Sequence, residues 1–162
     1  MSRKDLERVR DLVDLAEGRA PVPVLDDAAI AAVLRDARRI AVVGASPRPG
    51  RASNDVMGYL LDAGYDCVPV NPTVDEVLGR PAFPTVTAAA EAAGPFDIVD
   101  VFRRPEECAG PAREAVATGA WCVWLQLGIV SWEAARIAHD AGLGIVMDRC
   151  SMVEHRRLVA GR

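Results

Sequence analysis

Glycine, hydroxyl and arginine side chains gather directly after an apolar run in the first third of the chain. The run 40–43 reads Ile-Ala-Val-Val, and the residues that follow it include Gly44, Ser46, Arg48, Arg51 and Ser53. A glycine lets the backbone approach a ligand, hydroxyl groups form hydrogen bonds, and guanidinium groups supply positive charge. This composition predicts a phosphate-binding loop between a buried strand and the amino end of a helix, whose free amides add further donors.

A second pair of arginines follows another apolar run. Arg103 and Arg104 come directly after residues 97–102 and precede Pro105, a residue typical of the first turn of a helix. Positive charge is mildly unfavourable at the start of a helix, so the pair favours an anionic ligand at that place.

The elements that must position these loops follow from the hydrophobic periodicity. Buried strands are expected at 40–44, 66–70, 97–102, 121–125 and 144–147, with a short edge strand at 82–86. Helices are expected at 2–17, 26–39, 54–63, 103–119, 131–141 and 152–159, with one or two helical turns at 88–92. This alternation predicts an α/β fold with a doubly wound, mainly parallel sheet. We expect a single domain over 1–162, in which 1–39 form an N-terminal helical extension and 40–158 the core.

Ligands of doubly wound sheets bind beyond the carboxyl ends of the strands, where the strand order reverses. The loops at those ends are expected at 44–53, 70–73, 102–105, 126–130 and 148–151. Both arginine groups fall within them, so we expect one basic edge.

The pattern argues against two common nucleotide sites. A dinucleotide fingerprint needs G-x-G-x-x-G and an acid at the end of the second strand, but Ser46 stands at the second glycine and that strand ends in Val70-Asn71-Pro72. No Gly-Lys-Ser or Gly-Lys-Thr of a Walker loop follows either. Coenzyme A carries a pyrophosphate and a ribose 3′-phosphate, and several cationic and amide contacts suit it better than they suit NAD.

The composition of the chain argues against several classes of protein. The 162 residues are 51% apolar and 26% charged, with a net charge of -4, which argues against a general nucleic-acid binder. The four cysteines form no C-x-x-C pair, so zinc is not expected; Cys67, Cys122, Trp121 and Trp124 are expected in the core. A charged amino terminus and short apolar runs predict a cytoplasmic protein without a signal sequence or membrane span.

Five motifs, taken together, resemble those of a known family. They are V-V-G-A-S-P-R-P-G-R-A-S-N, V-P-V-N-P, V-D-V-F-R-R-P-E, W-L-Q-L-G-I and M-D-R-C-S-M-V-E-H, in this order along residues 25–158. The chain resembles the stand-alone CoA-binding proteins of bacteria and archaea, which are similar to the N-terminal CoA-binding domain of the succinyl-CoA synthetase α subunit. The resemblance implies a Rossmann-like topology and CoA or an acyl-CoA as the ligand.

The resemblance also implies site residues. The CoA phosphates would lie at Gly44, Ala45, Ser46, Arg48, Arg51 and Ser53. The adenosine would border Val70, Asn71 and Pro72, and the nucleotide or the start of the pantetheine arm would meet Val101, Phe102 and Arg103. The phosphohistidine domain and the second subunit of the synthetase do not fit in 162 residues. We therefore expect a binding module without ligase activity.

Two other functions stay open from the residues alone. Cys150 and His155 follow the last predicted strand, and a cysteine-dependent acyl-transfer or thioester enzyme could use them as nucleophile and base. An NAD(P)-binding redox or sensor domain is the less favoured alternative. The sequence leaves open a homo-oligomer or a partner protein.

Overall fold

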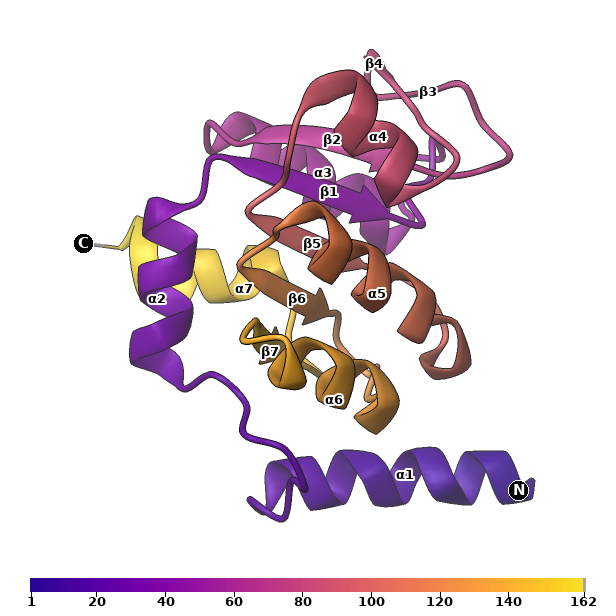
Figure 1. Ribbon diagram of the computed structural model, residues 1–162, viewed down its shortest axis with the longest axis vertical. Helices are drawn as coiled ribbons and strands as arrows, with labels where there is room; N and C mark the ends of the chain where they lie inside the picture. The colour runs from indigo at the N-terminus through magenta and orange to yellow at the C-terminus, as the bar shows by residue number, and fades with distance from the viewer. Residues whose placement is uncertain (162) are drawn as a thin grey trace.

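The computed structural model describes residues 1–161, and a parallel five-stranded sheet forms its centre (Figure 1). Its strands lie in the order β2-β1-β5-β6-β7. They are β1 (Arg39–Val43), β2 (Asp66–Val70), β5 (Ile98–Val101), β6 (Cys122–Leu125) and β7 (Gly144–Val146). The predicted α/β fold with a doubly wound sheet is confirmed.

Helices cover both faces of the sheet, and a further helix lies at the amino end of the chain (Figure 1). They are α1 (Arg3–Ala16), α2 (Asp27–Asp36), α3 (Ala52–Asp62), α4 (Val86–Ala93), α5 (Ala109–Thr118), α6 (Trp132–Asp140) and α7 (Ser151–His155). A 3-10 turn, Pro105–Glu107, precedes α5, and a π-helical segment, Arg156–Ala160, continues α7. α4, α5 and α6 cover one face, while α2, α3 and α7 cover the other.

Apolar side chains on both faces of each central strand explain the two helical layers. In β1, Ala41 and Val43 pack into the core beneath α4, α5 and α6, whereas Ile40 and Val42 pack toward α2 and α3. Because successive side chains of a strand point to opposite faces, a continuously apolar strand must be covered twice.

The strand order reverses beside β1. The chain runs from β1 outward to β2, and then returns to the other side of β1 as β5. The carboxyl ends of β1 and β5 therefore lie side by side, with Val43 paired to Val101. This places the loops that begin at Gly44 and Phe102 at one edge, where doubly wound sheets bind ligands.

Three local predictions need correction. Residues 82–86 do not form an edge strand: a hairpin of β3 (Glu76–Val77) and β4 (Arg80–Pro81) precedes them, and Phe83 alone bridges Val70. Pro81 and Pro84 have no amide hydrogen to extend the pairing. The helix predicted from residue 103 begins regularly only at Ala109, after the 3-10 turn.

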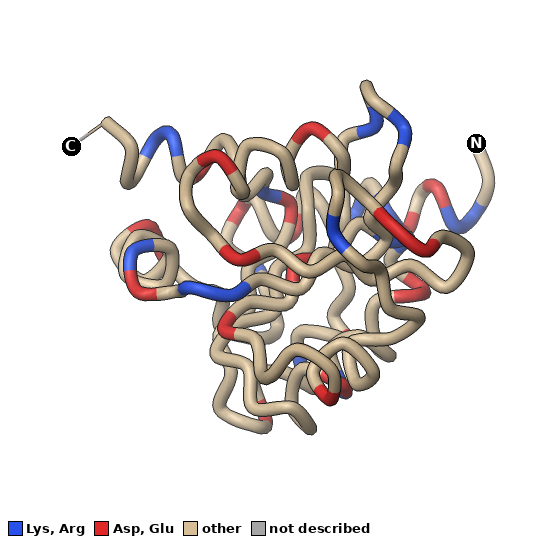
Figure 2. The backbone as a smooth tube through the Cα atoms, turned by 90° about the horizontal axis from the view of Figure 1, so that it is seen from above, with Lys and Arg blue, Asp and Glu red and all other residues tan. Residues whose placement is uncertain are grey.

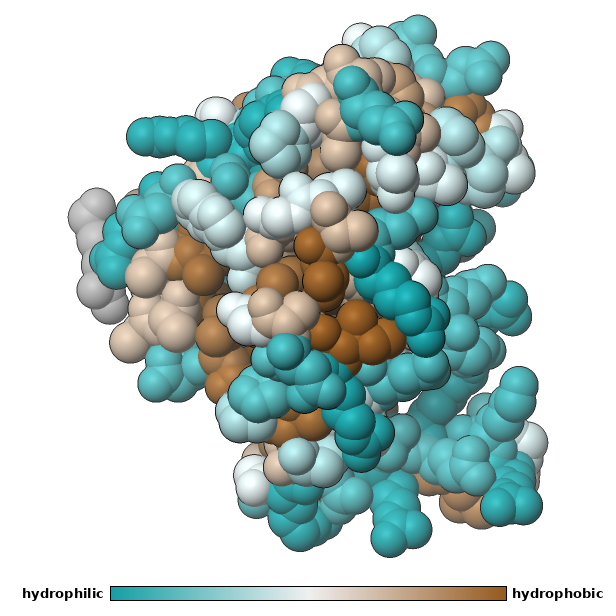
Figure 3. Space-filling model, viewed as in Figure 1, coloured by the Kyte–Doolittle hydropathy of each residue, from teal (hydrophilic) through white to brown (hydrophobic). Residues whose placement is uncertain are grey.

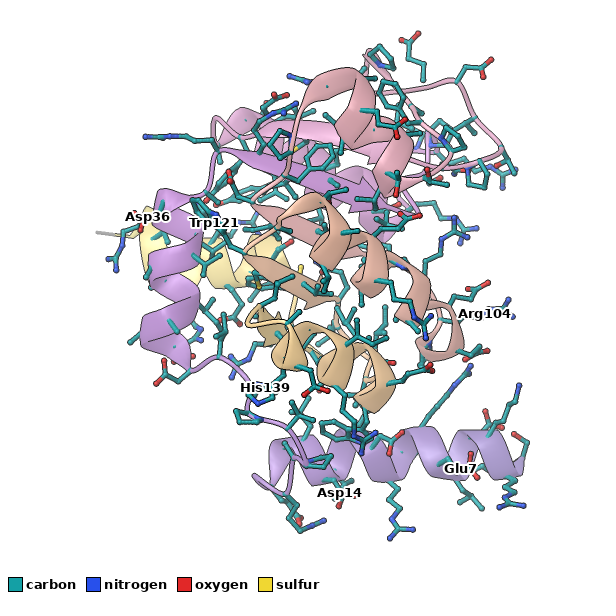
Figure 4. The ribbon with its side chains drawn as sticks, viewed as in Figure 1. Glu7, Asp14, Asp36, Arg104, Trp121 and His139 are labelled. Atoms are coloured by element: carbon teal, nitrogen blue, oxygen red, sulfur yellow. The ribbon has the colours of Figure 1, made fainter. Side chains whose placement is uncertain are left out.

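The third correction concerns the tryptophans. Trp124 is fully buried, as predicted, but Trp121 is 48% exposed. Trp121 precedes β6, at the end of the strands that lies near α2, away from the loops discussed above (Figure 4). Its position just outside the strand removes it from the core.

Charges of both signs are interspersed along the chain (Figure 2), and α1 presents a mainly hydrophilic outer surface (Figure 3). Within residues 1–161, the helices are all too short or too polar to cross a membrane.

Candidate functional site

A cleft of about 630 Å³ lies along the carboxyl edge of the sheet. Seven of the residues that the resemblance assigned to the CoA site line it: Gly44, Ser46, Arg51, Ser53, Asn71, Phe102 and Arg103. They come from the loops after β1, β2 and β5 and from the start of α3. The fold thus brings together groups that lie far apart in the chain.

Hydrogen bonds within the protein fix the loop after β1. The Ser46 amide donates to Ser53 Oγ at 3.0 Å, and Asn54 Nδ2 donates to the Ser46 carbonyl at 3.0 Å. Asn71 Nδ2 donates to the Ala45 carbonyl at 2.8 Å and so ties the loop after β2 to the same backbone. Ser53 and Asn71 therefore brace the loop in addition to bordering the cleft.

Gly44 permits a close approach of the loops after β1 and β5. Its φ is +82°, and a Cβ atom built on it would lie 2.5 Å from the Phe102 carbonyl oxygen and 3.4 Å from Arg103 Nε. Only glycine fits this backbone without displacing the neighbouring loop. The guanidinium of Arg103 consequently extends over the turn at Gly44.

The arginines of the cleft differ in their partners. Among the described residues, Arg51 and Arg103 form no side-chain hydrogen bond or ion pair. Arg104 also lines the cleft, but its guanidinium pairs with Glu107 at 3.1 Å and projects outward near the start of α5 (Figure 4). Arg51 and Arg103 are thus the cations with unused donors.

The amino end of α3 adds backbone donors to the same cleft. Arg51 is the N-cap residue and makes no side-chain cap, while Ala52 and Ser53 of the first turn line the cleft. First-turn amides have no acceptor within a helix and carry partial positive charge. This arrangement, together with Arg51 and Arg103, suits phosphate oxygens.

Five residues that the resemblance assigned to the site do not line the cleft: Ala45, Arg48, Val70, Pro72 and Val101. Ala45, Val70 and Val101 are buried, and Arg48 and Pro72 are exposed outside it. The buried three support the loops from beneath.

The sequence analysis missed a buried polar network under the cleft. Asp100 is fully buried in β5, and its carboxylate accepts hydrogen bonds from Gln126 Nε2 and from Ser151 Oγ, the latter at 2.8 Å. Burial raises the pKa of Asp100 to about 7, although both hydrogen bonds act in the opposite direction. An acid inside the apolar run Ile98–Val101 was the available signal.

Cys150 and His155, the nucleophile and base of the alternative enzyme, have separate surroundings. Cys150 lines the cleft, whereas His155 is buried and its Nδ1 lies 2.8 Å from Tyr59 Oη. Burial lowers the pKa of His155. No hydrogen bond joins Cys150 to His155 in residues 1–161.

Comparison with known proteins finds relatives of similar sequence and fold. The protein YneT of Bacillus subtilis (strain 168) is 45% identical over 128 residues, which are 79% of this chain and 93% of YneT. A hypothetical protein from Pyrococcus horikoshii OT3 has 43% identity and a TM-score of 0.79, covering 83% of this chain and 93% of the other.

A more distant similarity reaches a larger enzyme. The dinucleotide forming acetyl-coenzyme A synthetase 1 of Ca. Korarchaeum cryptofilum shares 25% identity at a TM-score of 0.57, over 66% of this chain and 25% of the synthetase. The family described as "CoA binding domain" matches residues 38–156. The chain therefore belongs to this CoA-binding domain family, as the five sequence motifs indicated.

Proposed function

We propose that the protein binds coenzyme A or an acyl-CoA with its phosphate groups at the loop after β1. Family membership supports CoA as the ligand. One observation supports the finer assignment: the guanidinium groups of Arg51 and Arg103, which have no partner within residues 1–161, border the same cleft as Gly44 and the amino end of α3. An electrostatically unsatisfied pair of this kind suits a ligand with several phosphates.

The order of the loops suggests how the ligand lies. Asn71 follows β2 at one end of the cleft, and Gln126, Leu127 and Cys150 follow β6 and β7 at the other. The adenosine would border Asn71, with the buried Val70 and Val101 and the neighbouring Ala45 and Pro72 shaping the loops. The pantetheine arm would pass Phe102 toward Cys150. In this proposal residues 40–158 form the binding core of a single domain, and 1–39 extend it.

The arrangement around Cys150 supports a proposal of binding without turnover. Its thiol has no histidine partner among the described residues, because His155 faces Tyr59. The chain matches only a quarter of the synthetase. We therefore propose a binding module without ligase activity rather than a thioester enzyme.

Calorimetric titration with CoA, dephospho-CoA, NAD and ATP tests the proposal. Arg51→Ala and Arg103→Ala should each weaken CoA binding roughly ten- to hundredfold, the value of a lost charged hydrogen bond of about 1.5–3 kcal/mol. Arg35→Ala, on the exposed side of α2, removes the same charge far from the cleft and should bind CoA as the wild type does. Equal affinities for CoA and dephospho-CoA would show that the protein makes no contact with the 3′-phosphate. Absence of CoA binding would refute the proposed function as a whole.

A further inference from the structure

A second cavity of about 400 Å³ adjoins the cleft at its β7 end. Leu127 and Cys150 line both the cleft and this cavity, so the two spaces meet at these side chains. Val146 and Met147 form the sheet side of the cavity, and Val153 of α7 closes another side.

The N-terminal extension supplies the remaining wall. Leu15 and Ala16 end α1, and Val24 and Leu25 belong to the linker that passes beside β7 (Figure 1). The Leu25 amide donates to the Ile145 carbonyl at 3.0 Å, which fixes the linker along the edge strand. The N-terminal extension thus forms one wall of the cavity.

Hydrogen bonds and an ion pair also hold α1 in place. Trp132 Nε1 of α6 donates to Asp11 Oδ1 at 3.1 Å, and Arg8 pairs with Glu106 at 2.9 Å. Leu15 packs against the core beneath α6. These contacts position the end of α1 where it lines the cavity.

The lining of the cavity suits an uncharged, apolar ligand. Leu127, Val153 and Val24 are large apolar side chains that are exposed by 71%, 47% and 36%, and all three border it. Its charged residues already have partners: Arg149 lies 3.5 Å from Glu154, and Asp148 Oδ1 accepts a hydrogen bond from the Gly128 amide at 2.7 Å. The lining therefore favours an apolar group over an ion.

The cleft runs along the sheet edge toward this cavity. From the phosphate loop after β1, the carboxyl edge continues past β5 and β6 to β7, three strand spacings or roughly 14 Å. An extended pantetheine arm can span this distance. Its sulfur would then reach Leu127 and Cys150, at the entrance of the second cavity.

We propose that this cavity binds the acyl chain of an acyl-CoA thioester. The inference rests on the proposed CoA site and adds the class of ligand, a thioester with a linear, uncharged acyl group. It also assigns a role to residues 1–39, which complete the acyl pocket that the core alone leaves open on one side.

Calorimetric titration with CoA and with its acetyl, butyryl, hexanoyl and octanoyl thioesters tests the inference. Each buried methylene should tighten binding up to about fourfold until the cavity is filled. Val153→Trp should occupy the cavity and abolish the dependence on chain length, while leaving the affinity for CoA unchanged. Val9→Trp is the matched control, because Val9 is 49% exposed on α1 and does not line the cavity.

The possible outcomes separate this inference from the proposed function. Affinities that do not change with chain length, in a wild-type protein that binds CoA, overturn the acyl site and leave the CoA site intact. A gain with chain length that survives in both Val153→Trp and Val24→Trp, which lie on two different segments of the lining, places the acyl chain elsewhere and also overturns the inference. Free octanoate that binds as tightly as octanoyl-CoA overturns the thioester assignment. Absence of CoA binding refutes the proposed function itself.

Discussion

Gly44 and Phe102 approach so closely that a Cβ atom on Gly44 would lie 2.5 Å from the Phe102 carbonyl oxygen. The contact joins the loops after β1 and β5, where the strand order of the sheet reverses. Both loops border the proposed CoA cleft. The geometry of the cleft therefore depends on a glycine at position 44.

Gly44→Ala should weaken CoA binding at least tenfold, because the added methyl group pushes the loop with Arg103 away from the phosphate site. The left-handed backbone adds about 1–2 kcal/mol of destabilisation. Gly142→Ala separates the two effects, since Gly142 has a φ of +83° but a Cβ atom on it would meet no other atom within 4 Å. Titration calorimetry and chemical denaturation measure both variants. Equal CoA affinity in Gly44→Ala and the wild type would contradict the role of the contact.

Arg103 and Arg104 should differ in their importance although they are neighbours. Arg103→Ala removes a guanidinium that has no partner among the described residues and should weaken CoA binding roughly ten- to hundredfold. Arg104→Ala removes one that Glu107 already holds at 3.1 Å, and should change the affinity less than about threefold. Both variants lose one charge, so each is the control of the other. A larger loss in Arg104→Ala would reverse the assignment.

Asp100 should make the protein less stable as the pH rises from about 4 to about 7. Its pKa is about 7 in the folded protein and 3.8 as the ordinary value, so over this interval the unfolded chain releases a proton that the folded chain retains. The folded state binds more protons, and the free energy of unfolding therefore falls with pH, by a few kcal/mol at most.

Asp100→Asn should remove this part of the pH dependence. An asparagine keeps the shape and can still accept from Gln126 and donate to Ser151. The measurement is the difference in unfolding free energy between wild type and variant, by urea denaturation at about pH 4.5 and about pH 7.5. Because both proteins contain His155, its contribution to the pH dependence cancels and that of Asp100 remains. A difference that does not change between these pH values would show that Asp100 does not titrate in this range.

Cys150 should react first among the four thiols. Cys67, Cys108 and Cys122 are buried, and burial raises the pKa of each to about 12, which suppresses their thiolate forms. Cys150 is partly exposed in the cleft. A chromogenic thiol reagent should label one cysteine of the native protein quickly, and CoA should slow this labelling.

Cys150→Ser provides the control for the labelling experiment. It should lose the fast phase and keep most of its affinity for CoA, because serine has nearly the size of cysteine and the proposed phosphate contacts are made by the loop after β1 and by Arg103. Fast labelling that persists in Cys150→Ser would mean that a buried cysteine becomes accessible. Cysteine-dependent hydrolysis of an acyl-CoA would instead support the enzyme alternative.

Local sequence patterns predicted most of the elements. α1 and α6 begin and end within one residue of the predicted ranges 2–17 and 131–141, and β2 spans Asp66–Val70 as predicted. Errors occurred where local signals were weak or mixed. The stretch 82–86, with Pro84 inside it and Pro81 directly before it, is an example. Which of its amides can pair depends on a neighbouring strand.

The sequence by itself determined the α/β alternation, the glycine turn at Gly44 and the family, because strand and helix periods and short motifs are local properties. Only the tertiary structure decided that Arg51 and Arg103 share one cleft while Arg48 lies outside it, and that Asp100 meets Ser151 beneath the cleft. Asp100 and Ser151 are 51 positions apart. Such contacts depend on the spatial order of the strands in the sheet, and a local periodicity does not encode that order.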